Sequence, residues 1–383
     1  MSVTEAQVLE ALRPVRDPEI NRSIVELDMV RGIAVAGSRV SVTVALTVAG
    51  CPMRTEITSR VTDAVRTLDG VDDVAVDLTV MTPGELDALR SKLQSSGGGH
   101  SHGGQPMAGG HGADVEIPMG QPGSKTRILG ITSGKGGVGK SSVTVNLAIA
   151  LAKQGYDVGL LDADVYGFSV PKMIGLGDAA PTVLDEGFIL PPVAHGVKVI
   201  SIGFFVEEDQ PVMWRGPMLH KALQQFLTDF EWGDPDFLLV DMPPGTGDVA
   251  LSMAQYLPKS EIFVVTTPQA AAQRVAQRTA YMAKKINQPL AAVIENMSWF
   301  TGDDGKRYEI FGSGGGEALA AELGVPLVGQ VPLVPQLREG GDAGRPITVS
   351  HPDSEASQAF DHLAKRVVDL APKRIYRPEL RIS

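Results

Sequence analysis

The segment from Gly134 to Ser142 most constrains what this chain can fold into, because it fits the P-loop pattern G-x-x-x-x-G-K-[ST]. An apolar run at 127–132 precedes it and predicts a strand. A helical pattern follows from Lys140 to Gln154, and Gly155 is placed to end that helix. A strand, a glycine-rich loop and a helix N-terminus together form a phosphate cradle. The alternative is a glycine-rich turn that matches the pattern by chance. The agreement of strand, loop and helix argues against it.

The residues of the segment predict a nucleotide site. We expect Lys140 to reach the β- and γ-phosphates of ATP and Ser141 to bind Mg²⁺. Lys135 places a second positive charge near the phosphates. The other expected nucleotide contacts are Gly134, Gly136, Gly137, Val138, Gly139 and Ser142.

Residues 125–371 alternate apolar strands with helices, which predicts an α/β, doubly wound, mostly parallel sheet. We expect strands at 127–132, 156–161, 197–202, 237–240, 261–266, 290–295 and 327–331. We expect helices at 140–154, 217–229, 270–286, 315–323 and 354–370. Ligands bind at the carboxyl ends of the strands in such sheets.

Carboxylates follow two of these expected strands. Asp241 ends an apolar strand and starts the sequence Asp-Met-Pro-Pro-Gly-Thr-Gly-Asp, which predicts a Walker B residue that holds Mg²⁺ through water. The glycine-rich part of this segment is expected to sense the γ-phosphate through its backbone. Asp162 and Asp164 follow the strand at 156–161. Their alternative role is to cap the following turn.

The run Gly-Lys-Gly-Gly-Val-Gly-Lys-Ser, with Lys135 directly after the first glycine, resembles the deviant-Walker ATPases of the MinD/ParA class. The resemblance implies a homodimer that sandwiches ATP, with Lys135 reaching the partner's nucleotide. It also implies that Asp162–Gly167 is the switch I segment. Asp164 would then orient the attacking water, and Asp162 would support Mg²⁺ or Lys140.

Residues 1–94 predict a separate, small α+β domain. We expect helices at 3–15, 53–68 and 83–94, and strands at 33–37, 39–47 and 71–80. The segments 17–20, 23–27 and 47–52 resemble the MIP18-like domain of iron–sulfur assembly proteins. For Asp17 and Glu19 we favour plain turn and cap roles.

Cys51 is the only cysteine, so no intramolecular disulfide can form. It lies in a Gly-Cys-Pro turn before an expected helix, where backbone N–H groups lower a thiol pKa. The alternative is a buried structural cysteine. The resemblance favours a reactive or metal-binding thiol. Residues 95–124 form a glycine-rich, flexible linker whose His100, His102 and His111 are either incidental or weak metal ligands.

Four segments of the larger domain resemble the Mrp/ApbC-type ATPases, which are iron–sulfur cluster carriers: 162–167, 241–248, 294–298 and 311–316. The resemblance implies cluster transfer to apoproteins and assigns an adenine contact to Asn296, whose alternative role is a strand-end turn residue. The family's Cys-x-x-Cys pair, which in a dimer would bridge one cluster, is missing from 299–310. Cys51 is then the only cysteine ligand available per protomer.

Bulk properties narrow the function further. The net charge of −11 argues against sequence-independent nucleic-acid binding. We expect a cytoplasmic protein, because no signal peptide and no run of membrane-spanning length is found. The tail at 372–383 has two prolines and little periodicity, which argues against a membrane anchor.

Three alternatives to a cluster carrier remain at this point. One is an ATP-switched scaffold for iron–sulfur assembly that holds no cluster itself. Another is a positioning ATPase of the MinD/ParA kind. The third is a metabolic kinase or ligase, for which the sequence offers no identifiable substrate pocket.

Overall fold

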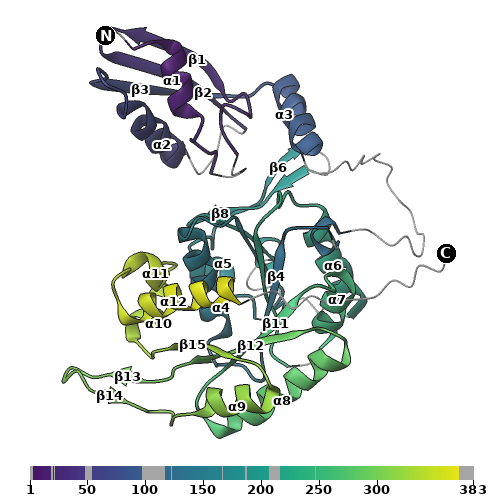
Figure 1. The fold of residues 1–383 in the computed structure, drawn as a ribbon. Coiled ribbons are helices and arrows are strands. Elements are labelled where there is room, and N and C mark those ends of the chain that lie inside the picture. The colour runs from purple at the N-terminus through teal and green to yellow at the C-terminus, as the bar shows by residue number, and fades with distance from the viewer. Residues whose placement is uncertain are drawn as a thin grey trace, which may run out of the picture. The chain divides into compact units, whose positions relative to one another are not determined.

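The computed structural model describes residues 3–18, 20, 22–47, 54–96, 117–121, 123–165, 167–185, 188–206, 216–245 and 247–370. The chain divides into two compact units. The first comprises residues 1–113 together with 182–190, and the second comprises 114–181 and 191–383. Figure 1 shows their elements.

The first unit is a small α+β domain around a three-stranded sheet of order β1-β2-β3. β1 and β2 are antiparallel, whereas β2 and β3 are parallel. Its strands are β1 (Val30–Ala36), β2 (Arg39–Leu46) and β3 (Asp73–Val80), and its helices are α1 (Glu5–Leu12), α2 (Arg54–Arg66) and α3 (Pro83–Ser96). The sequence predicted each of these elements, with somewhat different bounds.

Side-chain periodicity explains how this unit closes. In β2 the alternate residues Val40, Val42 and Val44 are fully buried, and one face of the sheet therefore faces the core. α1 begins at Thr4, which forms a reciprocal capping box with Gln7. The Asp17 carboxylate accepts a hydrogen bond from the Ile20 N–H at 2.8 Å, in agreement with a turn role for Asp17.

A second piece of chain completes the first unit. Strands β6 (Thr182–Asp185) and β7 (Phe188–Leu190) form an antiparallel pair. Leu190 is buried in the same hydrophobic cluster as the residues of α1, α2 and β2. The sequence did not predict that residues 182–190 belong with the N-terminal domain.

The second unit contains an eight-stranded sheet of order β15-β12-β11-β4-β10-β5-β9-β8. All neighbours run parallel except β8, which is antiparallel to β9. The strands are β4 (Arg127–Ser133), β5 (Val158–Asp162), β8 (Val193–Ala194), β9 (Val197–Ser201), β10 (Phe237–Asp241), β11 (Glu261–Thr266), β12 (Leu290–Asn296) and β15 (Leu327–Val331). Near-continuous apolar runs form these strands because both faces of the sheet are covered.

Helices cover the two faces (Figure 1). On one face lie α4 (Lys140–Lys153), α5 (Val170–Ile174), α10 (Pro335–Asp342), α11 (Ile347–Ser350) and α12 (Glu355–Asp369). On the other lie α6 (Gly216–Thr228), α7 (Asp248–Tyr256), α8 (Ala270–Lys285) and α9 (Gly315–Leu323). Two short 3₁₀ helices, η1 (Pro118–Gly120) and η2 (Ile202–Phe204), and a small hairpin of β13 (Phe300–Thr301) and β14 (Arg307–Tyr308) complete the described elements.

This architecture confirms the expected fold class, a mostly parallel α/β sheet preceded by a small α+β domain. The seven strands and five helices expected in the larger domain are present, although several bounds differ; the strand expected at 156–161, for example, runs from Val158 to Asp162. Among the described residues, no helix combines the length and hydropathy that crossing a bilayer requires.

Candidate nucleotide-binding site

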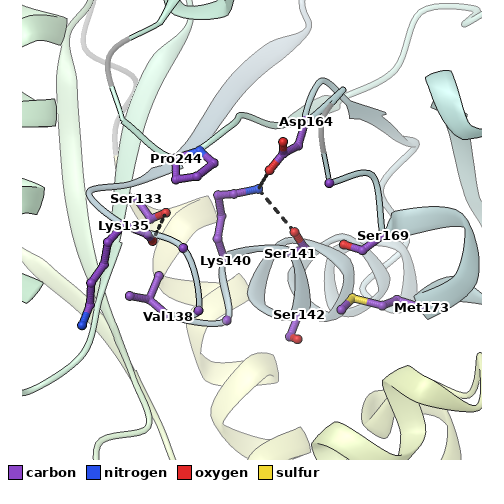
Figure 2. A pocket seen from close by; sticks show the side chains of 14 residues that line it. Ser133, Lys135, Val138, Lys140, Ser141, Ser142, Asp164, Ser169, Met173 and Pro244 are labelled. Carbon is purple, nitrogen blue, oxygen red and sulfur yellow. Dashed lines mark hydrogen bonds and ion pairs between the residues drawn. The ribbon is translucent and has the colours of Figure 1, made fainter. Parts of the chain in front are cut away.

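The P-loop lies where the sheet topology predicts a ligand site, at the carboxyl edge of the central strand β4. A pocket of about 240 Å³ opens over it (Figure 2). The pocket is lined by Ser133, Lys135, Gly136, Gly137, Val138, Gly139, Lys140, Ser141, Ser142, Asp164, Gly167, Ser169, Met173 and Pro244. Gly167 and Pro244 belong to the segments 162–167 and 241–248, which the sequence placed at the nucleotide site. Ser169, which precedes α5, and Met173, which lies in α5, were not predicted.

Two glycines of the P-loop are required by the local geometry. Gly139 has φ of 78°, and a Cβ there would lie 2.2 Å from Asn296 Nδ2. A Cβ on Gly134 would lie 2.2 Å from the backbone nitrogen of Ala276 in α8. A side chain at either position would displace a neighbouring element, so the loop can approach α8 and β12 only with glycine.

Lys140, Ser141 and Asp241 form a compact polar cluster at the floor of the pocket. Lys140 Nζ lies 2.6 Å from Asp241 Oδ2, and the Ser141 hydroxyl donates to the same oxygen at 2.6 Å. The other oxygen of Asp241 accepts from the Thr144 hydroxyl at 2.8 Å. Lys140 and Asp241 are both buried. The carboxylate thus holds the lysine and serine side chains at the start of α4.

Asp162 lies beside Asp241 because parallel pairing of β5 and β10 places the two residues opposite each other. Its carboxylate accepts hydrogen bonds from the Ser201 hydroxyl at 3.0 Å and from the backbone N–H groups of Asp164 and Val170. Burial, followed by the negative charge of Asp241, raises the pKa of Asp162 to about 7, although Lys140 and the hydrogen bonds act in the opposite direction. Asp162 therefore holds both ends of the segment 164–170 through these backbone hydrogen bonds.

Asp164 faces the same cluster from the side of that segment. Its Oδ2 lies 3.8 Å from Lys140 Nζ, and Figure 2 shows the carboxylate pointing toward the lysine. The structure therefore brings Lys140, Ser141, Asp162, Asp164 and Asp241 together, as strand-end reasoning predicted.

Lys135 has a different orientation. Its side chain points away from Lys140 in Figure 2, and its Nζ lies 3.4 Å from Gln269 Oε1. The Ser133 hydroxyl donates to the backbone carbonyl of Lys135 at 3.0 Å and so fixes the loop at this point. The Lys135 ammonium therefore does not join the Lys140 cluster.

Asn296 is buried behind the P-loop and is not among the residues that line the pocket. Its Nδ2 donates to the carbonyl of Val138 at 2.9 Å. Its Oδ1 is buried without a hydrogen-bond partner among the described residues. In this structure Asn296 supports the loop backbone, a contact that the sequence did not predict.

The residues present fit a Mg²⁺–nucleotide. Mg²⁺ prefers oxygen ligands, and Ser141 and Asp241 offer a hydroxyl and a carboxylate within one hydrogen bond of each other. The glycine-rich loop at the N-terminus of α4 presents backbone N–H groups to phosphate oxygens. Lys140 adds a cation between Asp241, at the end of β10, and Asp164.

The segment 299–310 forms the hairpin of β13 and β14. Glu355 accepts hydrogen bonds from Trp299 Nε1 at 3.0 Å, from the Thr301 hydroxyl at 2.8 Å and from Arg307 at 3.0 Å. The Arg307 guanidinium also lies 4.1 Å from the centre of the Trp299 ring. Within the described part of the chain, no group of three or more His, Cys, Asp or Glu side chains is arranged to hold a metal ion. Cys51 and the linker histidines lie outside the described residues.

The fold and site together define a P-loop NTPase. Residues 124–368 match the family model described as ParA, NUBPL iron-transfer P-loop NTPase, and residues 5–78 match an iron–sulfur cluster assembly protein model. The chain therefore belongs to the iron–sulfur cluster carrier family of ParA-type P-loop NTPases, with an N-terminal iron–sulfur assembly domain.

Individual relatives agree with this assignment. The chain is 47% identical over 366 residues to an iron–sulfur cluster carrier protein of Mycobacterium tuberculosis, covering 94% of this chain and 92% of the relative. It is 44% identical over 373 residues to the carrier protein of Synechocystis, covering 96% and 97%. Among solved structures, a nucleotide-binding protein of Archaeoglobus fulgidus in complex with ADP is similar, with a TM-score of 0.52, 35% identity, and coverage of 62% of this chain and 93% of that one.

Proposed function

We propose that this protein is a Mg²⁺-dependent ATPase that works as a homodimer in the cytoplasm and transfers iron–sulfur clusters to apoproteins. The observation that carries the ATPase half is the cluster of Lys140, Ser141 and Asp241 at the P-loop. The cluster-carrier half is supported by relatives over nearly the whole chain and by the assembly domain at residues 5–78.

Each residue has a defined part in this proposal. The P-loop N–H groups and Lys140 bind the phosphates, and the Lys140–Asp241 ion pair opens as phosphate replaces the carboxylate. Ser141 and Asp241 hold Mg²⁺, which supplies positive charge to the transferred phosphoryl group. Asp164 orients the attacking water, and Asp162 holds the Asp164 segment in place.

Lys135 and Asn296 have two further roles in this proposal. Lys135 reaches the nucleotide of a second protomer, a role favoured by its orientation away from its own cluster (Figure 2). Asn296 contacts the adenine base. Its buried Oδ1 has no partner among the described residues, and an amino group of a base would satisfy it.

The cluster is cargo in this proposal, and the chain has to supply some of its ligands. Thiolates are the usual ligands, and Cys51 supplies one per protomer, hence two per dimer. The hairpin at 299–310 contains neither cysteine nor histidine. The second candidate function is therefore an ATP-switched scaffold that assembles other proteins without binding a cluster itself.

Hydrolysis is tested by measuring phosphate release from MgATP by the full-length protein. We expect Lys140→Ala to abolish turnover, because the buried lysine is the main cation at the phosphates. Lys285→Ala, at an exposed lysine in the last turn of α8, serves as the matched control and should keep the wild-type rate. Retained turnover in Lys140→Ala would overturn the P-loop assignment.

Cluster binding is tested by anaerobic reconstitution with iron and sulfide, followed by assays of iron, acid-labile sulfide and visible absorbance. A cluster that forms in the wild type and is lost in Cys51→Ser would establish a carrier anchored by Cys51. If the wild type forms none, the carrier proposal fails for this chain and the scaffold is favoured.

A further inference from the structure

Glu295 is a buried carboxylate at the end of β12 that the proposed reaction does not use. It is 1% exposed. Its Oε1 accepts hydrogen bonds from the Ser298 hydroxyl and from Gln330 Nε2, both at 2.9 Å. Its Oε2 accepts from the backbone N–H of Gly316 at 2.5 Å. One side chain thus joins β12, β15, the start of α9 and the turn that follows β12.

The sequence around α9 is adapted to this carboxylate. A Cβ on Gly316 would lie 2.8 Å from the Cβ of Glu295, and one on Gly315 would lie 2.3 Å from the Pro268 carbonyl. Glycine at both positions allows the N-terminus of α9 to approach the end of the sheet. The Gly316 N–H and the positive end of the helix dipole then stabilise the buried negative charge.

The residues after Glu295 connect it to two other parts of the molecule. Asn296 donates to the Val138 carbonyl and so holds the P-loop. Met297 is in the left-handed region with φ of 57°, which is costly for a residue other than glycine. Ser298 donates to Glu295, and its own N–H donates to Val331 O at 3.0 Å. The hairpin begins at the next residue, Trp299.

We propose that Glu295 is a positioning residue that couples the P-loop to the base of the hairpin at 299–310. Nucleotide binding moves the Val138 backbone, Asn296 follows it, and the Glu295–Ser298 bond transmits the change through the strained Met297 to Trp299. The inference rests on the proposed nucleotide binding at the P-loop. It assigns the nucleotide a defined effect on the hairpin at 299–310.

The hairpin is suited to report such a change. Glu355 at the start of α12 holds both strands, through Thr301 of β13 and Arg307 of β14, and β13 follows closely after the Glu295 turn. The Trp299 carbonyl accepts from Leu333 N at 2.7 Å, so a shift at Ser298 alters hydrogen bonds on both sides of the turn. Changes in these bonds alter amide hydrogen exchange.

The experiment measures hydrogen exchange of peptides spanning 299–310 in the full-length protein, with and without MgADP, while calorimetry measures ADP affinity separately. We expect MgADP to slow exchange in these peptides of the wild type. Glu295→Gln places an amide where three donors converge, so we expect it to lose at least half of the slowing while it still binds ADP. Ser298→Ala removes only the hydroxyl donor, and we expect the same loss of slowing. This second variant tests the coupling even if Glu295→Gln fails to fold.

Glu261→Gln is the matched control, since Glu261 is also a buried carboxylate of this sheet. It lies at the amino end of β11, away from the P-loop, and its carboxylate is 2.6 Å from Arg127. This control variant should keep the full response. The coupling would be overturned if both Glu295→Gln and Ser298→Ala keep the full slowing of hydrogen exchange. It would also be overturned if bound MgADP leaves exchange of the 299–310 peptides unchanged in the wild type. A wild type that binds no ADP would instead refute the proposed nucleotide site.

Discussion

Single residues in the P-loop pocket balance one another's charges. Lys140 is buried against Asp241 and lies near Asp164, and the backbone and hydroxyl groups around Asp162 satisfy its carboxylate. A buried lysine without a partner would be strongly unfavourable. Phosphate binding therefore exchanges one ion pair for another and does not have to create a charge interaction where none existed.

The orientation of Lys135 leads to a prediction about hydrolysis. Lys135→Ala should lower the rate of ATP hydrolysis at least about tenfold, because a cation supplied in trans to phosphoryl transfer is worth about 10³–10⁵ in other P-loop enzymes. ATP affinity should stay nearly unchanged, since Lys140 and the loop backbone remain in place. Steady-state phosphate release and calorimetric titration measure the two effects. A wild-type rate in this variant would exclude the trans-acting role.

The geometry at Gly139 leads to a prediction about stability. Gly139→Ala should destabilise the nucleotide-free protein by about 1–3 kcal/mol, because alanine is strained at a φ of 78° and its Cβ would meet Asn296. Gly136→Ala is the control, as its Cβ would enter open space, and its effect should stay within about 0.5 kcal/mol. Urea denaturation measures both. Equal stabilities of the two variants would show that the loop relaxes around the new methyl group.

At the scale of elements, the sequence predicted what local pattern determines. The strands of the larger sheet were predictable because apolar runs such as Phe237–Val240 are buried on both faces. α7 was missed because it follows directly from the polar loop after Asp241, and α5 was missed because it has only 5 residues. The two-residue strands of the hairpin depend on Glu355, which is distant in sequence.

The candidate site divides in the same way. Carboxylates at strand ends, such as Asp162 and Asp241, were predictable because parallel strands bring their carboxyl ends to one edge. Ser169 and Met173 line the pocket from a loop and a short helix whose path no local pattern determines. The support of the P-loop by Asn296 required the distance to Val138, which only the tertiary structure supplies.

The hairpin leads to a prediction about pH. Burial raises the pKa of Glu355, but hydrogen bonds from Thr301 and Trp299 and the charge of Arg307 outweigh it and leave the pKa below its ordinary value of 4.5. A depressed carboxyl pKa contributes stability that is present above about pH 4.5 and is lost as the pH falls through the lower, folded-state pKa. Glu355→Gln should lack this component.

The stability contribution of the Glu355 carboxylate is measured from the urea midpoints of the wild type and Glu355→Gln. The midpoints are compared between neutral pH and a pH well below 4.5. The stability difference between the two proteins should shrink on acidification. A difference that stays constant with pH would show that the Glu355 carboxylate has the same pKa in the folded and unfolded chain, against the hydrogen bonds described here.

At the scale of the whole molecule, both units carry the iron–sulfur assignment. The iron–sulfur cluster assembly model matches residues 5–78, and the iron-transfer NTPase model matches residues 124–368, so each unit contains one of the two matched segments. The N-terminal sheet with its antiparallel β1–β2 pair and the parallel sheet of the second unit have separate hydrophobic cores. Each unit thus has the interior that an independently organised domain requires.

The hairpin of β6 and β7 has a consequence for how this chain can be divided. Residues 182–190 belong to the first unit by packing, although they lie within the second in sequence. A single cleavage in the linker would therefore leave the N-terminal fragment without Leu190, which is part of its hydrophobic cluster. A fragment that is to keep the full core of the first unit must therefore carry residues 182–190 as well as the N-terminal segment.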